Sequence, residues 1–190
     1  MKIIDISQEI LSSNVYPGDP CPKAERLNSM DKGELYNLSA FYMGAHNGTH
    51  IDAPSHFIKD GKNIDQLSYE STVGYCYVAR FKGDLSARDA TLLLEKAENE
   101  GVGERILVAG DATVTEEAAE VFAKAGVKLL GNESQTVGPK EAPMKVHQIL
   151  LSADVVLLEG IVLENVPEGK YFLSAMPLNL KGFEMTELCR

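Results

Sequence analysis

The sequence has no hydrophobic run long enough to cross a membrane, which takes about 20 consecutive apolar residues. The most apolar stretch, residues 155–163, is short and contains Glu159 and Gly160. Near the amino terminus, Asp5 stands where a signal peptide would continue its apolar core. We therefore expect a cytoplasmic protein with no membrane partner.

Basic residues and cysteines are also scarce. Lys and Arg total 18 against 28 Asp and Glu, for a formal net charge of -10. A field of this sign repels the phosphate backbone of nucleic acids, so we expect no nucleic-acid partner. The cysteines, Cys21, Cys76 and Cys189, are odd in number and far apart. They match neither a disulfide framework nor a clustered zinc site, and we expect them to stay reduced.

The remaining composition is typical of a globular protein. The 190 residues are 44% hydrophobic and 24% charged, which excludes disorder, collagen and coiled coil and is sufficient for a hydrophobic core. The sequence contains no internal repeat and no linker long enough to divide it. We expect a single domain that covers residues 1–190.

Hydrophobic periodicity predicts strands in the first half of the chain, over residues 2–7, 34–43 and 75–82. Prolines and a glycine predict a loop at residues 16–20. In the strand at residues 34–43, one predicted face carries Tyr36, Leu38, Ala40 and Tyr42.

The second half alternates helices with short apolar strands. A capping box of Ser86 and Asp89 begins the first predicted helix, which ends at Gly101. The second helix runs from Thr115 to Gly126, with Ala118, Val121, Phe122 and Ala125 facing inward. The third covers residues 143–153, with Val146, Ile149, Leu150 and Ala153 facing inward. Strands are predicted at residues 106–109, 127–130 and 155–158, and this alternation indicates a mixed α/β fold.

The four histidines are unevenly distributed. His46, His50 and His56 lie within eleven residues, close to Asp52. In an extended chain, side chains alternate between faces, so His46, His50 and Asp52 would point the same way. A glycine and a proline in this segment disfavour the helical alternative. We expect a strand or a tight loop that brings two imidazoles and a carboxylate together.

Two imidazoles and a carboxylate are the ligand set of many catalytic zinc sites, and manganese or iron also accept it. The spacing alone leaves two other interpretations open: polar residues on a surface loop, or a closed structural zinc site. His56 could be a further ligand or the group that transfers protons.

The fourth histidine, His147, lies on the third predicted helix, and Glu159 follows twelve residues later at the end of an apolar strand. A glutamate at the end of a buried strand is costly unless it is paired, and a metal ion is one such partner. Exposure at the strand end or a salt bridge would also explain this glutamate.

The segment from His46 to His56, H-N-G-T-H-I-D-A-P-S-H, resembles the H-x-G-T-H-x-D-x-P-x-H signature of the metal-dependent cyclase family, which includes bacterial kynurenine formamidase and isatin hydrolase. The likeness extends over most of the chain, through Asp5-Ile6-Ser7, Tyr16-Pro17-Gly18-Asp19, Asp60-Gly61, His147-Gln148-Ile149-Leu150-Leu151 and Glu159. The resemblance implies a compact α/β fold of the swivelling β/β/α type, with a mixed sheet, a β-barrel-like centre and flanking helices. It also implies a homodimer or a higher homo-oligomer.

The resemblance further implies a role for each site residue. One divalent ion would be held by His46, His50 and Asp52. Asp52 would bridge to a second ion completed by His147 and Glu159, with zinc as the expected metal and manganese as the alternative. The remaining roles are those of His56, as proton donor and acceptor, and Tyr16, which stands where formamidases have a tryptophan that contacts substrate.

Three segments depart from the family pattern. Ala109-Gly110-Asp111 stands where relatives often have Arg-Thr-Gly, and Gly131-Asn132-Glu133 replaces a usual Gly-x-Asp. Residues 183–187 replace an ending of the Asp-x-Ser-Pro-x-Arg type. These changes spare the expected metal ligands and touch the expected pocket walls.

Together these features predict a metal-dependent hydrolase that cleaves an amide carbon–nitrogen bond by attack of a metal-bound hydroxide. The first candidate substrate is an aryl formamide such as N-formylkynurenine. The alternatives are a hydrolase of a cyclic amide or lactone and a non-catalytic metal- or ligand-binding protein on the same fold. Tyr16, Phe41 and Tyr42 offer an aromatic wall for a substrate, but core packing is the stronger expectation for Phe41 and Tyr42.

Overall fold

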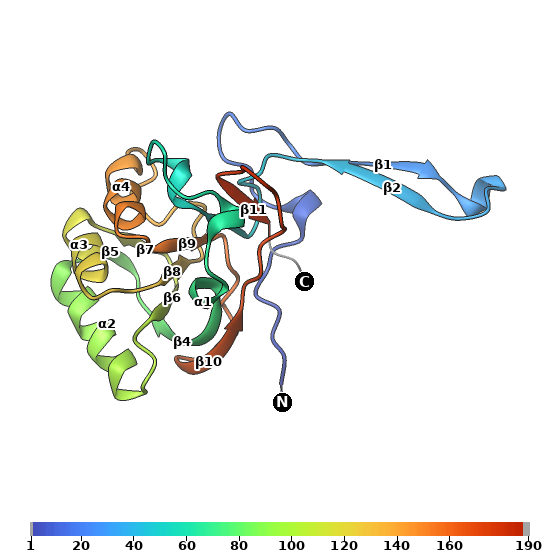
Figure 1. Ribbon diagram of the computed structural model, residues 1–190. Coiled ribbons are helices and arrows are strands. Elements are labelled where there is room, and N and C mark those ends of the chain that lie inside the picture. Colours follow the sequence, from blue (N-terminus) through green and yellow to red (C-terminus); the bar gives the residue numbers. More distant parts are fainter. Residues whose placement is uncertain (1, 188–190) are drawn as a thin grey trace.

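A seven-stranded mixed sheet forms the centre of the protein in the computed structural model, which describes residues 2–187 (Figure 1). The strand order is β10-β4-β6-β8-β9-β3-β11. Neighbouring strands among β4, β6, β8 and β9 run parallel, while β10, β3 and β11 pair antiparallel to their neighbours. The bounds are β3 His50–Asp52, β4 Val73–Arg80, β6 Arg105–Ala109, β8 Leu129–Asn132, β9 Val156–Glu159, β10 Gly169–Ser174 and β11 Met185–Glu187.

Four α-helices, four short 3-10 helices and two smaller sheets complete the regular structure of the described residues. The helices are α1 Tyr69–Thr72, α2 Ala87–Asn99, α3 Glu116–Lys124 and α4 Met144–Ser152. The smaller sheets pair β5 Gly83–Leu85 with β7 Ala112–Val114, and β1 Lys23–Asn28 with β2 Leu38–Tyr42. Short 3-10 helices span Ile10–Ser12, Met30–Lys32, Pro54–His56 and Ile64–Gln66.

Apolar side chains cover both faces of the central strands, which explains their continuous apolar sequences. Helices α2, α3 and α4 pack on one face, where Phe122 is fully buried among side chains from β4, β6, β8 and β9. The second face is covered by loops and by residues near the amino terminus, including Ile4 and Ile6. The predicted α/β fold, with a mixed sheet and flanking helices, is confirmed.

The predicted helices form with small shifts at their ends. In α2, the Ser86 hydroxyl accepts a hydrogen bond from the Asp89 backbone N–H (3.3 Å), and the Asp89 carboxylate accepts one from the Ser86 N–H (3.0 Å). The capping box is therefore confirmed. Ala125 and Ala153, expected to face inward, are exposed because α3 and α4 end one residue before them.

Several strand predictions need correction: the strand expected at residues 34–43 begins only at Leu38, and the one expected at 75–82 spans Val73–Arg80. Residues 2–7 form no strand: Ile4 and Ile6 pack on a face of the sheet, and the carbonyl oxygen of Ile6 accepts a hydrogen bond from Val162 (2.8 Å). Their alternating pattern thus reflects packing without strand pairing. The strand expected at residues 127–130 is displaced toward the carboxyl terminus, because β8 spans Leu129–Asn132.

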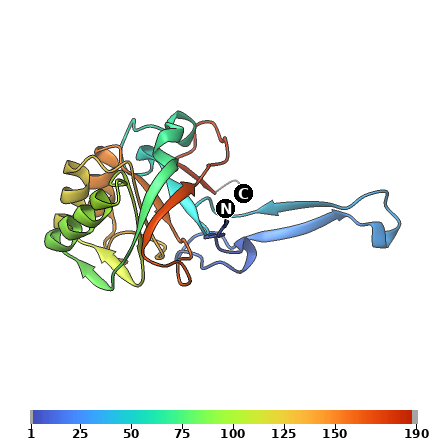
Figure 2. The ribbon, with the colours of Figure 1, turned by 90° about the horizontal axis from the view of Figure 1, so that it is seen from below.

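Strands β1 and β2 form a hairpin arm that extends away from the body of the protein (Figures 1 and 2). Every residue of β2 is exposed, including Phe41 (67%) and Tyr42 (63%). The expectation that these two aromatic residues pack in the core is wrong, because no core lies beneath the arm. We name residues 23–42 the hairpin arm.

Two of the three cysteines lie within the described residues. Cys21 is exposed, Cys76 is buried, and both are free thiols, whereas Cys189 lies outside the described residues. Within residues 2–187, no helix is long and apolar enough to span a bilayer.

Candidate metal centre and active site

The pairing of β3 with β9 brings together residues from distant parts of the chain. In this antiparallel pair, His50 lies opposite Glu159 and Asp52 lies opposite Leu157. Because side chains alternate along a strand, His50 and Asp52 project to the same face. Leu157 belongs to the core on the helical face, which α4 covers, and α4 carries His147.

The result is a compact cluster of buried imidazoles and carboxylates. His50 Nε2 lies 3.5 Å from Asp52 Oδ1 and 3.4 Å from Glu159 Oε2. His147 Nε2 lies 3.1 Å from Glu159 Oε1 and 3.6 Å from Asp52 Oδ2. All four residues are at most 3% exposed. Simple exposure of Glu159 at the strand end is therefore excluded.

Backbone carbonyl groups orient both buried imidazoles. His50 Nδ1 lies 3.2 Å from the Gly48 carbonyl oxygen, and His147 Nδ1 lies 2.9 Å from the Pro143 carbonyl oxygen. A carbonyl oxygen only accepts hydrogen bonds, so each Nδ1 carries a hydrogen and each Nε2 faces the carboxylates. This arrangement presents the Nε2 atoms as ligands.

His46 and His56 complete the cluster from its more open side. His46 lies in a turn before β3, with its Nδ1 atom 3.1 Å from Asp52 Oδ1. His56 lies in the 3-10 helix after β3, with its Nε2 atom 3.9 Å from Asp52 Oδ2. The side chains of His46 and His56 are 22% and 25% exposed. The expected strand or tight loop is confirmed, and it is in fact a turn followed by a short strand.

Two candidate sets of metal ligands share one carboxylate. Two sets of ligand atoms each lie within 4.8 Å of one another: His46, His50 and Asp52, and Asp52, His147 and Glu159. Both carboxylate oxygens of Asp52 and the Nε2 atom of His50 are buried and accept or donate no hydrogen bond within the described residues. Buried polar atoms without partners are costly. A divalent cation would satisfy all three.

The charges around the cluster shift its pKa values. Burial lowers the pKa of His50, but the neighbouring Glu159 and Asp52 carboxylates outweigh it and raise that pKa to about 9. The pKa of His147 is raised because Glu159 likewise outweighs burial. Burial acts to raise the pKa values of Asp52 and Glu159, yet both are lowered, because histidines lie beside each carboxylate. Protons therefore neutralise the cluster in the metal-free chain, and metal ions would replace them.

His56 shows the opposite shift. Its pKa is lowered, mainly by burial, and this effect exceeds the opposing charge of Asp52. The imidazole is thus neutral at neutral pH and is able to accept a proton.

A cavity of about 240 Å³ opens onto the cluster. It is lined by five site residues (His46, His50, His56, His147 and Glu159), together with Tyr16, Phe57 and Thr136 among others. Tyr16 reaches this cavity as expected, and its hydroxyl donates a hydrogen bond to the Lys140 carbonyl oxygen (3.3 Å). Phe41 and Tyr42 do not line it, so Tyr16 alone remains of the three aromatic residues proposed as a wall, and Phe57 lies in the lining beside it.

Several functional contacts come from backbone groups that sequence patterns do not reveal. The Val137 N–H donates a hydrogen bond to Glu159 Oε1 (2.8 Å), and two backbone carbonyls orient the histidines. The departure at Glu133 is also explained. Its carboxylate accepts hydrogen bonds from the N–H groups of Gly110 and Leu163, both at 2.6 Å. Two of the three segments that depart from the family pattern therefore contact each other, through Gly110 and Glu133.

Comparison with known proteins agrees with this geometry. The model of the Cyclase family, described as "Putative cyclase", matches residues 4–139. A kynurenine formamidase of Erythrobacter litoralis (strain HTCC2594) is 34% identical, with 100% of this chain and 92% of that protein covered. A solved structure described as a potential metal-dependent hydrolase with cyclase activity is 26% identical, with a TM-score of 0.81, and 98% of this chain and 94% of that chain are covered.

The fold also resembles that of isatin hydrolase A from Labrenzia aggregata, with a TM-score of 0.80 at 19% identity over 98% of this chain and 91% of that chain. This protein therefore belongs to the cyclase family. The curated relatives and the two ligand sets support a metal-dependent amide hydrolase.

Proposed function

We propose that this protein hydrolyses the amide bond of an aryl formamide, with N-formylkynurenine as the first substrate to test. The observation that carries the proposal is the pair of ligand sets that share the buried Asp52 at the base of a cavity. The name of the curated relatives, kynurenine formamidase, supports this choice of substrate.

The proposal assigns the ligands of two zinc ions, or of manganese as the alternative. His46, His50 and Asp52 hold one ion, and Asp52, His147 and Glu159 hold the other. Divalent ions at these positions would activate water and polarise the substrate carbonyl group. The chain itself orients the imidazoles of His50 and His147 through backbone carbonyls and excludes bulk water from the four buried side chains.

We assign His56 to proton transfer. Hydrolysis of a formamide adds water across the carbon–nitrogen bond: a carbon–oxygen bond forms, the carbon–nitrogen bond breaks, and formate and an aryl amine leave. His56 accepts a proton as water attacks the carbonyl carbon and donates it to the departing nitrogen. Its position at the rim of the cluster, with its Nε2 atom 3.9 Å from Asp52 Oδ2, suits this role.

The test begins with metal content. Elemental analysis should find two divalent ions per chain in protein purified without chelator. The metal-loaded protein should then convert N-formylkynurenine to kynurenine and formate, and the His56→Ala variant should be much slower at equal metal content. No turnover above that variant would refute the proposal. Assays with isatin and with a simple lactone show whether a cyclic substrate is preferred.

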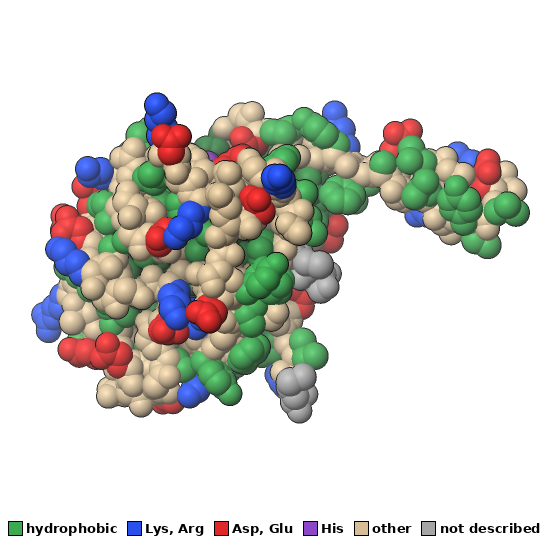
Figure 3. Space-filling model, viewed as in Figure 1, with side chains coloured by type: hydrophobic (Ala, Val, Ile, Leu, Met, Phe, Trp, Pro, Cys, Tyr) green, Lys and Arg blue, Asp and Glu red, His purple; other side chains and the backbone are tan. Residues whose placement is uncertain are grey.

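We also propose that the protein forms a homodimer or a higher homo-oligomer through the hairpin arm. The arm exposes many large apolar side chains, and hydrophobic atoms cover much of its surface in Figure 3; they are Leu27, Met30, Leu35, Tyr36, Leu38, Phe41 and Tyr42. An isolated two-stranded hairpin is only marginally stable in water, so a second copy of the chain would supply the missing apolar contacts.

Light scattering after gel filtration tests this proposal. A Leu35→Ser, Phe41→Ser double variant should shift the mass toward that of one chain. The control is Leu92→Ser, which changes an exposed leucine on α2 and should leave the mass unchanged. A parent protein of single-chain mass would refute the proposal.

A further inference from the structure

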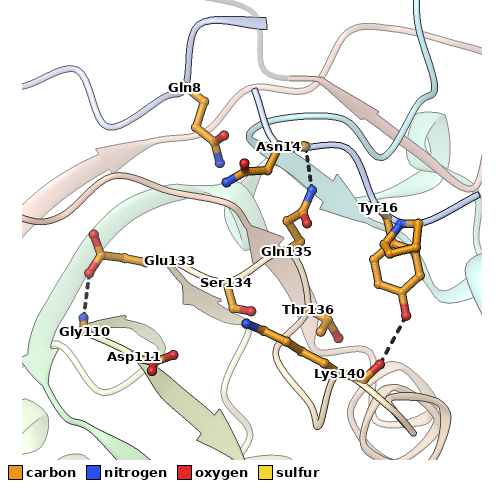
Figure 4. A pocket seen from close by; sticks show the side chains of 11 residues that line it. Gln8, Asn14, Tyr16, Gly110, Asp111, Glu133, Ser134, Gln135, Thr136 and Lys140 are labelled. Carbon is orange, nitrogen blue, oxygen red and sulfur yellow. Dashed lines mark hydrogen bonds between the residues drawn. The ribbon is translucent and has the colours of Figure 1, made fainter. Parts of the chain in front are cut away.

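A second cavity adjoins the one over the metal centre. Its volume is about 500 Å³, and Tyr16, Gln135 and Thr136 line both cavities (Figure 4). Sites for small molecules typically measure about 300–1,000 Å³. The metal-side cavity alone, at about 240 Å³, falls below this range. A substrate whose amide bond lies at the metals would therefore extend into the second cavity.

The shared wall contains a buried hydroxyl group without a partner. Thr136 is 4% exposed, and its Oγ1 atom makes no hydrogen bond within the described residues. The loop is nevertheless held in place, because the Thr136 carbonyl oxygen accepts a hydrogen bond from Asn132 Nδ2 (3.2 Å) and the next residue, Val137, donates to Glu159. A polar ligand group at the junction of the cavities would satisfy the hydroxyl.

The charged residues that line the second cavity differ in whether their side chains have hydrogen-bond partners. Glu133 is engaged by the backbone N–H groups of Gly110 and Leu163. The side chains of Asp111 and Lys140 are exposed and make no hydrogen bond or ion pair in residues 2–187. The backbone of Lys140 is held at the cavity, because its carbonyl oxygen accepts a hydrogen bond from the Tyr16 hydroxyl. Figure 4 shows the Lys140 side chain extending toward Ser134.

We propose that the second cavity binds a carboxylate on the substrate, with Lys140 as the specificity-determining cation and the Thr136 hydroxyl as a hydrogen-bond donor at the junction. This inference rests on the proposed function and narrows its substrate class to amides that carry an anionic group on the leaving part. The chain has a formal net charge of -10. That field repels an anionic substrate, and a cation in the cavity offsets the repulsion locally.

Calorimetry measures how tightly the metal-loaded protein binds two analogues of the aryl amine product. The probes are 4-(2-aminophenyl)-4-oxobutanoic acid and its methyl ester, which differ in the negative charge. The parent protein should prefer the acid. Lys140→Met should reduce this preference about fivefold or more, and Lys140→Arg should largely restore it. Lys124→Met, which removes the same charge from the surface of α3, should leave the preference unchanged.

Two further variants separate recognition from structure. Asp111→Asn should leave binding of the acid unchanged or make it tighter, because it removes a like charge beside the ligand. Thr136→Val, which keeps the shape of the side chain, should weaken binding of the acid and binding of the ester to a similar extent. Equal affinity of the parent for acid and ester, or an unchanged preference in Lys140→Met, would overturn the proposal.

Binding requires no turnover, so the two proposals fail separately. Preferential binding of the acid without hydrolysis of any formamide would refute the proposed function and leave the carboxylate site standing. Hydrolysis of formanilide and N-formylkynurenine with equal efficiency, together with no effect of Lys140 on binding, would refute the carboxylate site and leave the proposed function standing.

Discussion

The stability of the metal-free protein should fall as the pH rises through the weakly alkaline range. The cause is His50, whose pKa is raised from 6.5 to about 9 by the carboxylates of Glu159 and Asp52. A group whose pKa is raised on folding stabilises the folded state fully below its unfolded pKa and loses that contribution as the pH rises through the folded pKa. The relevant window therefore begins near pH 6.5 and extends to about pH 9.

The magnitude follows from the size of the shift. At about 1.4 kcal/mol per pKa unit, the full contribution of the buried His50 is about 3 kcal/mol. Between pH 6.5 and pH 8.5, linkage predicts a loss of about 2 kcal/mol in the free energy of unfolding. For a chain of this length, that loss corresponds to about 4–8 °C in Tm. His147 acts in the same direction, because its pKa is also raised.

Urea denaturation in the presence of a chelator, followed by circular dichroism at several pH values, measures this dependence. His50→Gln should flatten the curve, and His147 should account for what remains. An unfolding free energy that is constant or rises between pH 6.5 and pH 8.5 would refute the assignment of these charges.

Added zinc should reverse the sign of the pH dependence of stability. A coordinated imidazole must be neutral, so the metal competes with the protons on His50 and His147. The increase in Tm caused by added zinc should therefore grow from pH 6.5 to pH 8.5. A zinc effect that shrinks over this range would contradict the placement of these imidazoles as ligands.

Three substitutions test other parts of the structure. Asp52→Asn should remove both ions, because both ligand sets use this carboxylate; elemental analysis that still finds two ions would argue against sharing. His56→Ala should lower kcat by roughly 10²–10⁴ with unchanged metal content, as steady-state assays would show. Gly160→Ala should cost about 2 kcal/mol or more, because its φ is +66° and its new methyl group would meet the Gly48 carbonyl oxygen. The matched control, Gly101→Ala, has φ +70° and open space around it, so equal losses of stability in urea would exclude the clash.

The two halves of the chain differ in how well their sequences predict their structure. Helix α2 follows directly from its capping box and its buried stripe of Ala90, Leu93, Leu94 and Ala97, which are local signals. The hairpin arm shows where such reasoning fails. The alternation around Phe41 is real, but a period of two does not reveal whether a core lies beneath the strand.

The sequence by itself determined which side chains are candidate ligands, because His50 and Asp52 lie on one face of an extended segment and His46 precedes them closely. Only the tertiary structure brought Glu159 and His147 to the same cluster. That contact depends on the register between β3 and β9 and on the packing of α4 over the same face. Backbone contacts such as the one between Val137 and Glu159 are likewise set by the fold, since every residue except proline carries the same N–H group.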